Sequence, residues 1–275
     1  CGRFGTPSHS GSLIVRLFHA GILASSGNSP RAHRAGYDPA VTNISLAAGA
    51  AHQAKADALV IGIGQSEDRK PVLAPGAEGV DAALKRRLLA TLASLGATGK
   101  AGDCHRIATF GATAAPVVVA VGLGPAPRRG QRYYAEAIRR GAGAAVRSLA
   151  GTRRVAISLP LTQGPDDGVR PIAEGALLGA YGYLRYRTTS LDDHRPPVES
   201  IAVLVPDAKS KNAKAALARA EVVAEAVCAT RDLVNTPPSD LHPKEFAEFA
   251  AGEARRLNLE IEVLDEKALK KGGYG

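Results

Sequence analysis

The sequence predicts an α/β fold in which helices cover a largely parallel sheet. From about residue 41 onward, short β-branched runs alternate with stretches whose apolar residues recur at helical spacing, as in a parallel sheet with crossover helices. The 275 residues are enough for one domain plus part of another. The composition, 45% hydrophobic and 22% charged, is globular, and no apolar run reaches the roughly 18 residues of a membrane span. We therefore expect a soluble protein.

The first 37 residues differ from the rest in composition. They hold four arginines and no acidic residue, in a chain of net charge +9 that contains no methionine. A basic, Ser-rich segment of this kind is typical of an organelle transit peptide, but translated sequence upstream of the true start has the same character, and we favour the second interpretation. We expect residues 1–37 to be disordered or not part of the mature protein.

Residues 38–207 are interpreted as one N-terminal α/β domain. The run 117–121 is almost continuously apolar, as expected for a strand buried on both faces, and is placed at the sheet centre. The polar, Pro-containing stretch 188–198 is expected to be a surface loop. Strands are expected at residues 43–46, 58–63, 105–110, 116–121, 154–159 and 200–205. Crossover helices are expected at residues 80–95, 132–149 and 172–186.

Residues 208–275 begin with a long Ala-rich helix, which has to end at Pro237 and Pro238. Pro243 suits the first position of a second helix, and alternating apolar and acidic residues over 259–263 predict a strand. Asp265 can cap a short third helix. Two helices and one strand cannot bury their apolar faces unaided, so this part is interpreted as a linker helix and the start of a truncated second domain.

Two glycine motifs follow predicted strands, where phosphate-binding loops occur in nucleotide-binding folds. They are Gly62-Ile63-Gly64 and Gly122-Leu123-Gly124. Neither completes a GxGxxG or Walker pattern, so we expect tight turns. The basic residues Arg128, Arg129, Arg132, Arg139 and Arg140 could attract a polyanion, but a solvated helix face is the simpler interpretation.

No metal site or nucleophile can be identified. Asp192, Asp193 and His194 are suitable ligand types, but three neighbours in a loop do not define a coordination sphere. Cys104 and His105 are adjacent in a strand, so their side chains point to opposite faces and cannot act together. The cysteines form no CxxC pair, which favours a reducing compartment. We predict no catalytic, metal-binding or cofactor-binding residue in this chain.

The most informative stretches lie near the end of the chain. Residues 229–239 (ATRDLVNTPPS) and 263–275 (VLDEKALKKGGYG) closely resemble the start of the catalytic domain in the leucyl aminopeptidase family, the cytosol aminopeptidases, and its actinobacterial members especially. Residues 174–186 resemble the last helix of the family's N-terminal domain, and residues 119–124 resemble its central strand and turn. The resemblance covers roughly residues 40–275.

This resemblance implies a macro-like N-terminal domain, a long linker helix and a larger catalytic domain, assembled as a homohexamer in the cytoplasm. It also implies two divalent ions, manganese or zinc, which polarise the carbonyl next to a free N-terminus of a peptide and activate a water. The family's motifs KGxTFDxGG and NTDAEGR are absent here, so no ligand is carried over. We expect the metals and the activity in the full-length protein, and an inactive chain as it stands.

A second hypothesis is a non-catalytic macro-like module. It would bind nucleotide or nucleic acid through the strand-end glycines and the basic residues between Arg128 and Arg140. The resemblance permits this, because some members of the family bind DNA as well as cleaving peptides. DNA is therefore retained as a possible partner, and a membrane is not.

Overall fold

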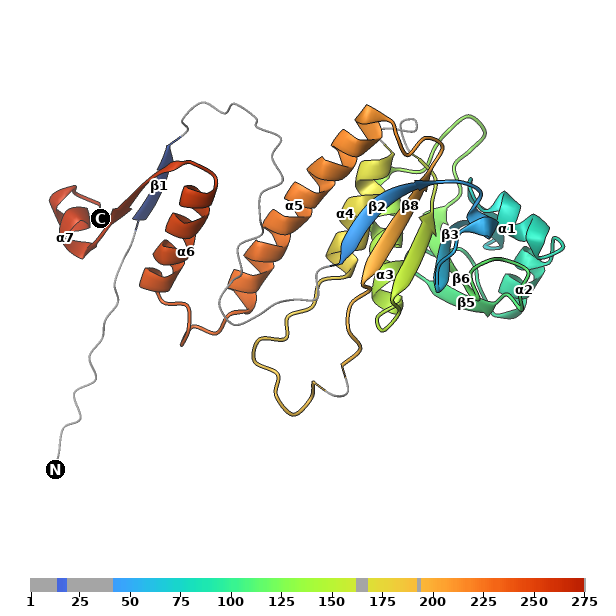
Figure 1. Ribbon diagram of the computed structural model, residues 1–275, viewed down its shortest axis with the longest axis horizontal. Helices are drawn as coiled ribbons and strands as arrows, with labels where there is room; N and C mark the ends of the chain where they lie inside the picture. The colour runs from blue at the N-terminus through green and yellow to red at the C-terminus, as the bar shows by residue number, and fades with distance from the viewer. Residues whose placement is uncertain (1–13, 19–41, 162–167, 192–193, 275) are drawn as a thin grey trace. The chain divides into compact units, whose positions relative to one another are not determined.

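The computed structural model (Figure 1) describes residues 14–18, 42–161, 168–191 and 194–274. The chain divides into two compact units, residues 33–229 and residues 230–275 with the N-terminal segment. This division falls inside helix α5 (Lys211–Asn235). The boundary at residue 207, expected from the sequence, stays a prediction. Among the described residues, no helix is both long and apolar enough to cross a membrane.

The larger unit is built on a sheet with the strand order β2-β8-β7-β3-β6-β5. The first five of these strands run parallel, whereas β5 pairs antiparallel with β6. A short strand, β4 (Pro71–Leu73), adds antiparallel to β3. Each strand expected from the sequence is present. The bounds are β2 Asn43–Ala48, β3 Ala58–Gln65, β5 Cys104–Ala108, β6 Val117–Pro125, β7 Arg154–Ser158 and β8 Ser200–Val205.

Strand β6 does not lie at the sheet centre, where its valine run had placed it. It lies between β3 and the edge strand β5, and β3 takes the inner place between β7 and β6. β6 is nevertheless buried from Val118 to Gly124. A continuous apolar run indicates that both faces of a strand are covered, which does not determine how far the strand lies from the edge.

Helices cover both faces of this sheet, which gives the unit three layers. Neighbouring residues of β3 show the division, because Val60 belongs to the core under one helical layer and Ile61 to the core under the other. The first layer comprises α3 (Ala135–Ser148), α4 (Val169–Gly179) and the start of α5. The second comprises the 3-10 turn η1 (Ala51–Gln53), α1 (Glu78–Ala83) and α2 (Leu88–Ser94).

Two of the expected crossover helices differ from the prediction. The helix expected at residues 80–95 is interrupted at Lys85 and Arg86, whose φ angles are 56° and 58°. The Asp81 carboxylate accepts a hydrogen bond from the Leu88 backbone N–H at 3.0 Å and so satisfies a free donor at the start of α2. The helix expected at residues 172–186 ends at Gly179, since glycine has a low helix propensity.

The second unit follows the signals in its sequence. Helix α6 (Pro243–Arg256) begins at its proline, and Asn258 follows it with a φ of 54°. The alternating residues form β9 (Glu260–Leu264). Asp265 then caps α7 (Glu266–Lys271) by accepting a backbone hydrogen bond at 2.8 Å.

Strand β1 (Ile14–Phe18) pairs antiparallel with β9. This strand lies within residues 1–37, which were expected from the sequence to be disordered or not part of the mature protein. That expectation stays a prediction, although residues 14–18 form a strand here. The sequence IVRLF contains Ile, Val and Phe, which favour strands, and the pairing supplies hydrogen-bond partners to the backbone of β9. The other residues of 1–37 lie outside the described ranges.

Candidate functional site

The glycines at the ends of β3 and β6 do not form a phosphate cradle. A Cβ atom added to Gly64 would meet the Tyr133 hydroxyl, and one added to Gly122 would meet the backbone carbonyl oxygen of Lys100. Gly62 is enclosed by side chains in the same way, with the Leu123 side chain 2.8 Å from an added Cβ. Protein atoms therefore occupy the space that a phosphate would need, and the glycines allow close packing between segments.

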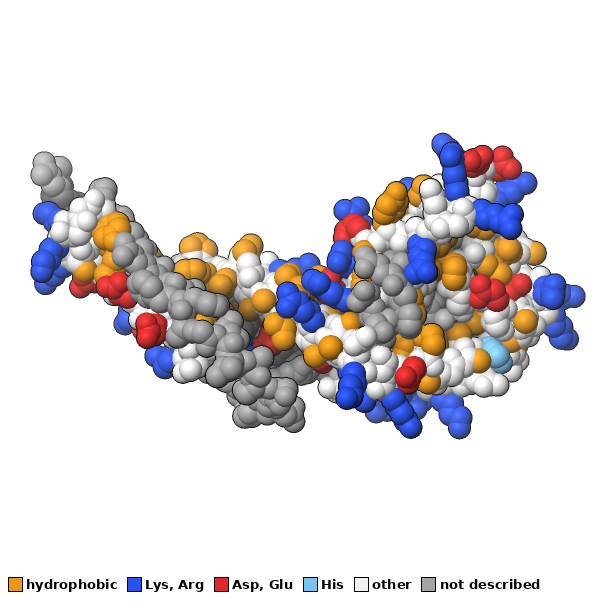
Figure 2. All heavy atoms as spheres, turned by 90° about the horizontal axis from the view of Figure 1, so that it is seen from above, with side chains coloured by type: hydrophobic (Ala, Val, Ile, Leu, Met, Phe, Trp, Pro, Cys, Tyr) orange, Lys and Arg blue, Asp and Glu red, His pale blue; other side chains and the backbone are white. Residues whose placement is uncertain are grey.

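The basic cluster is partly neutralised by neighbouring acids. Glu136 pairs with both Arg139 and Arg140, and Arg139 also donates to Glu174 at 2.8 Å. These hydrogen bonds hold the pKa of the Glu136 carboxyl below its usual range. Figure 2 shows Lys and Arg side chains spread over the visible face, with Asp and Glu side chains among them. Neither the glycines nor the arginines support the nucleic-acid-binding alternative.

Glu174, on α4, is the most buried acid in the described ranges, and its role was not predicted from the sequence. Its side chain is 5% exposed and lies between two guanidinium groups. One oxygen accepts from Nε of Arg139 on α3 at 2.8 Å, and the other accepts from Nε of Arg170 at 2.6 Å. The four-residue spacing between Arg170 and Glu174 was a readable signal for one pair, whereas the partner on α3 is distant in sequence. Each oxygen accepts one of these bonds, so the group ties α4 to α3.

Cys104 and His105 lie on opposite faces of β5. The Cys104 thiol packs against the core beneath α3, and burial raises its pKa. The Nε2 atom of His105 is buried without a hydrogen-bond partner. A thiol whose pKa is raised is a poor nucleophile, and the imidazole cannot reach it across the strand.

The described ranges contain no group of three His, Cys, Asp or Glu side chains that could hold a metal ion. His194 belongs to the loop in which Asp192 and Asp193 were weighed as ligands, but those two aspartates lie outside the described residues. This part of the chain therefore does not fit a metal centre.

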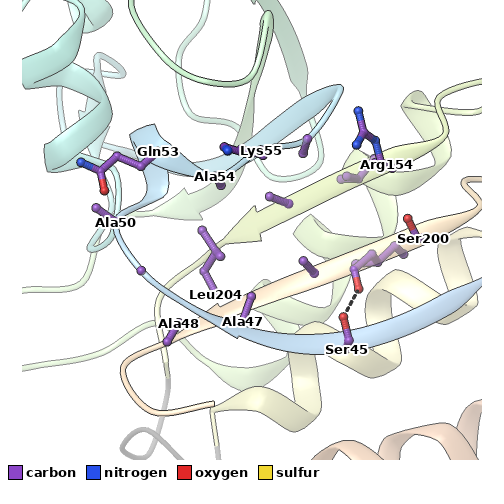
Figure 3. A pocket seen from close by; sticks show the side chains of 16 residues that line it. Ser45, Ala47, Ala48, Ala50, Gln53, Ala54, Lys55, Arg154, Ser200 and Leu204 are labelled. Atoms are coloured by element: carbon purple, nitrogen blue, oxygen red, sulfur yellow. Dashed lines mark hydrogen bonds between the residues drawn. The ribbon is translucent and has the colours of Figure 1, made fainter.

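A shallow hollow of about 390 Å³ lies against one face of the sheet, over β2, β8 and β7 (Figure 3). Small side chains such as Ala47 and Ala202 line it, together with Leu204. Its ionisable side chains are Lys55 and Arg154, and Arg154 is paired with Asp57 at 2.9 Å outside the hollow. A catalytic pocket combines an apolar lining with several converging polar groups, which this hollow lacks.

Comparison with known proteins identifies relatives for most of the chain. Residues 60–190 match the model of the N-terminal domain of the cytosol aminopeptidase family. The chain is 43% identical over 243 residues to a probable cytosol aminopeptidase of Streptomyces avermitilis, and the match covers 86% of this chain and 47% of the relative. A protein of the same name from Rhodococcus jostii is 40% identical, over 80% of this chain and 42% of its own length. The chain thus spans about half the length of the curated relatives it matches.

Solved structures show the same fold. A mutant of tomato leucine aminopeptidase matches 80% of this chain and 43% of its own chain with a TM-score of 0.64 at 23% identity, which is a likeness of fold alone. The bottromycin maturation enzyme BotP, in complex with Mn, matches 73% of this chain and 36% of its own with a TM-score of 0.52 at 27% identity. The predicted α/β class is confirmed.

Proposed function

We propose, from the match of residues 60–190 to the N-terminal domain of the cytosol aminopeptidase family, that the protein is a metal-dependent leucyl aminopeptidase. It would release N-terminal amino acids, preferably leucine, from peptides. The observation that supports this most strongly is the 43% identity to a probable cytosol aminopeptidase, which extends over 86% of the chain and so includes the segment after the N-terminal domain.

We propose two divalent ions, manganese or zinc, as the cofactors of the whole protein. The BotP structure was solved in complex with Mn, which supports manganese for a related fold. When bound, such ions polarise a peptide carbonyl and lower the pKa of the attacking water. The described residues of this chain do not fit a metal centre, so the proposal places the ligands in the part of the protein that the relatives have and this chain does not span.

In this proposal the larger unit supports the catalytic part and takes no chemical step itself. Protein atoms fill the space beside its strand glycines, and its most buried carboxylate among the described residues accepts hydrogen bonds from two arginines. We also propose a homohexameric assembly and a cytoplasmic location, in line with the resemblance to cytosol aminopeptidases. The Cys104 thiol, which is not in a disulfide, is consistent with a reducing compartment.

Hydrolysis of leucine p-nitroanilide with added Mn²⁺ tests the proposal. The 275-residue chain is compared with a chain extended through the downstream reading frame, and EDTA provides the metal control. We expect activity only in the extended chain and its loss with EDTA. Activity in the 275-residue chain would place the catalytic site within these residues. An inactive extended chain, with Mn²⁺ or Zn²⁺, would refute the assignment.

A further inference from the structure

Strand β2 forms one edge of the larger sheet, beside β8 (Figure 1). The Asn43 backbone N–H donates to the carbonyl oxygen of Glu199, just before β8, at 2.9 Å. In a parallel ladder the N–H and C=O of one residue point to the same side and alternate residues point to opposite sides. Ile44, Leu46 and Ala48 therefore direct their backbone groups away from the sheet. Within the described ranges, no strand pairs with that side of β2.

This edge lacks the usual devices that prevent strands from adding to it. Such devices are charged side chains, prolines and bulges. The β2 sequence NISLAA has no charge and no proline, and its register with β8 is regular over all six residues. The opposite edge strand, β5, carries Arg106. β2 therefore presents a regular row of donors and acceptors, and no residue of the strand itself is a charged side chain or a proline that would repel a further strand.

We propose that β2 is a self-association edge, at which β2 of a second copy adds antiparallel about a two-fold axis. The register that joins the outward-pointing residues as hydrogen-bonded pairs sets Leu46 opposite the partner's Leu46 and Ile44 opposite the partner's Ala48. No charges of like sign then face each other. The two-fold axis relates the contacts of one copy to those of the other, so the same six residues of β2 form the junction in both copies.

The surface next to β2 favours a second copy over a single extended peptide. Ser45 and Ala47 point to the face that carries the hollow, beside Ala202 and Leu204 on β8 (Figure 3). The β8 residues on this face are half-exposed, whereas Ile201 and its neighbours on the other face are buried. A second sheet edge brings an equivalent strip of small side chains to the two-fold junction, which extends the contact beyond the strand itself. A lone peptide contributes only its own strand.

Sedimentation velocity of the purified 275-residue chain, over a series of concentrations, tests this proposal. We expect a concentration-dependent monomer–dimer equilibrium. Ala48→Pro removes one outward N–H in each copy, so two hydrogen bonds per dimer are lost and the dissociation constant should rise about tenfold or more. Hydrogen exchange gives a second readout, because the amides of Ile44, Leu46 and Ala48 should become more protected as the dimer forms.

Ala108→Pro is the matched control. Ala108 is also an exposed alanine at the end of an edge strand, and its N–H points outward because the next residue, Thr109, donates to Pro116 on the β6 side. The same substitution at this opposite edge should leave the equilibrium unchanged. Equal weakening by both variants would contradict the proposal, because it would indicate a general loss of structure.

Ser45→Lys provides an independent variant that keeps every backbone donor. Ser45 is exposed on β2, and in this register a charge there would lie diagonally across from its symmetry equivalent near the two-fold axis, so dimerisation should weaken at low salt and partly recover at high salt. A chain that stays monomeric at all concentrations would overturn the proposal. A monomeric chain whose Ile44, Leu46 and Ala48 amides are protected only by an added extended peptide would also overturn it and would make the edge a peptide site.

Discussion

Replacing Glu174 with glutamine tests how the two main helices of the larger unit are held together. The carboxylate accepts hydrogen bonds from Arg139 on α3 and Arg170 on α4, and its side chain is only 5% exposed. A hydrogen bond to a charged group contributes about 1.5–3 kcal/mol. Glutamine keeps one acceptor oxygen, and the two arginine side chains are 31% and 45% exposed, so water can partly replace the lost partner. We therefore expect a loss of about 2–3 kcal/mol in the free energy of unfolding.

Urea denaturation followed by circular dichroism measures this loss. With a slope of about 2–3 kcal/mol per molar urea, the midpoint should fall by about 1 M. Glu136→Gln is the control, because that carboxylate pairs with Arg139 and Arg140 but is 56% exposed, and exposed ion pairs contribute at most about 1 kcal/mol. If the two variants shift the midpoint equally, or if Glu174→Gln leaves it unchanged, the argument from burial is wrong.

Four further substitutions test other features. Gly122→Ala should lower the free energy of unfolding by about 3 kcal/mol or more, because the added Cβ would overlap a backbone carbonyl oxygen. Gly252→Ala, in α6, has no atom within 4 Å of the added Cβ and should raise the free energy of unfolding by about 0.5–1 kcal/mol. Thermal unfolding compares the two variants. A hydrogen bond from Arg154 lowers the folded-state pKa of Asp57 below 3.8, so its stabilisation is present above the unfolded pKa and is lost as the pH falls through the folded one. Asp57→Asn should flatten that acid-side decline, and an unaltered profile would count against the pair. Phe110 has a φ of 49°, which asparagine tolerates better than phenylalanine, and its side chain is 97% exposed, so burial contributes little to stability here. Phe110→Asn should therefore raise the free energy of unfolding by about 1 kcal/mol, and a lower melting temperature would contradict this.

The strands of the larger unit could be predicted from the sequence because burial leaves a local pattern of apolar residues. The order of the strands could not, since it depends on pairing between segments far apart in the chain. The valine run of β6 shows the difference, because it indicated a buried strand but not its neighbours β3 and β5. The break at Lys85 and Arg86 was missed for another reason. Both residues are good helix formers, and the turn depends on positive φ angles that propensity does not reveal.

Less of the candidate site than of the fold could be predicted from the sequence. The strand-end glycines were expected to form tight turns, but they lie inside β3 and β6. What fills the space beside them depends on distant contacts such as that between Gly64 and Tyr133. The partner of Glu174 on α4 was readable from the four-residue spacing, and the partner on α3 was not. A strand was predicted at residues 43–46, where β2 begins, but its place at a sheet edge emerges only from the topology.

The stretch that begins at Glu174 carried part of the family resemblance, and its residues have a packing role that is independent of catalysis. A Cβ on Gly175 would meet the backbone carbonyl oxygen of Arg139, and one on Gly179 would meet the backbone of Gly143. The backbones of α3 and α4 therefore touch along these glycines, and this close approach lets Arg139 reach Glu174. A side chain at Gly175 would separate the helices and break that hydrogen bond together with the contact. The resemblance in this stretch thus reflects how the N-terminal domain packs and not how it catalyses. Gly175→Ala should therefore unfold this unit even in the 275-residue chain, for which no peptidase activity is expected.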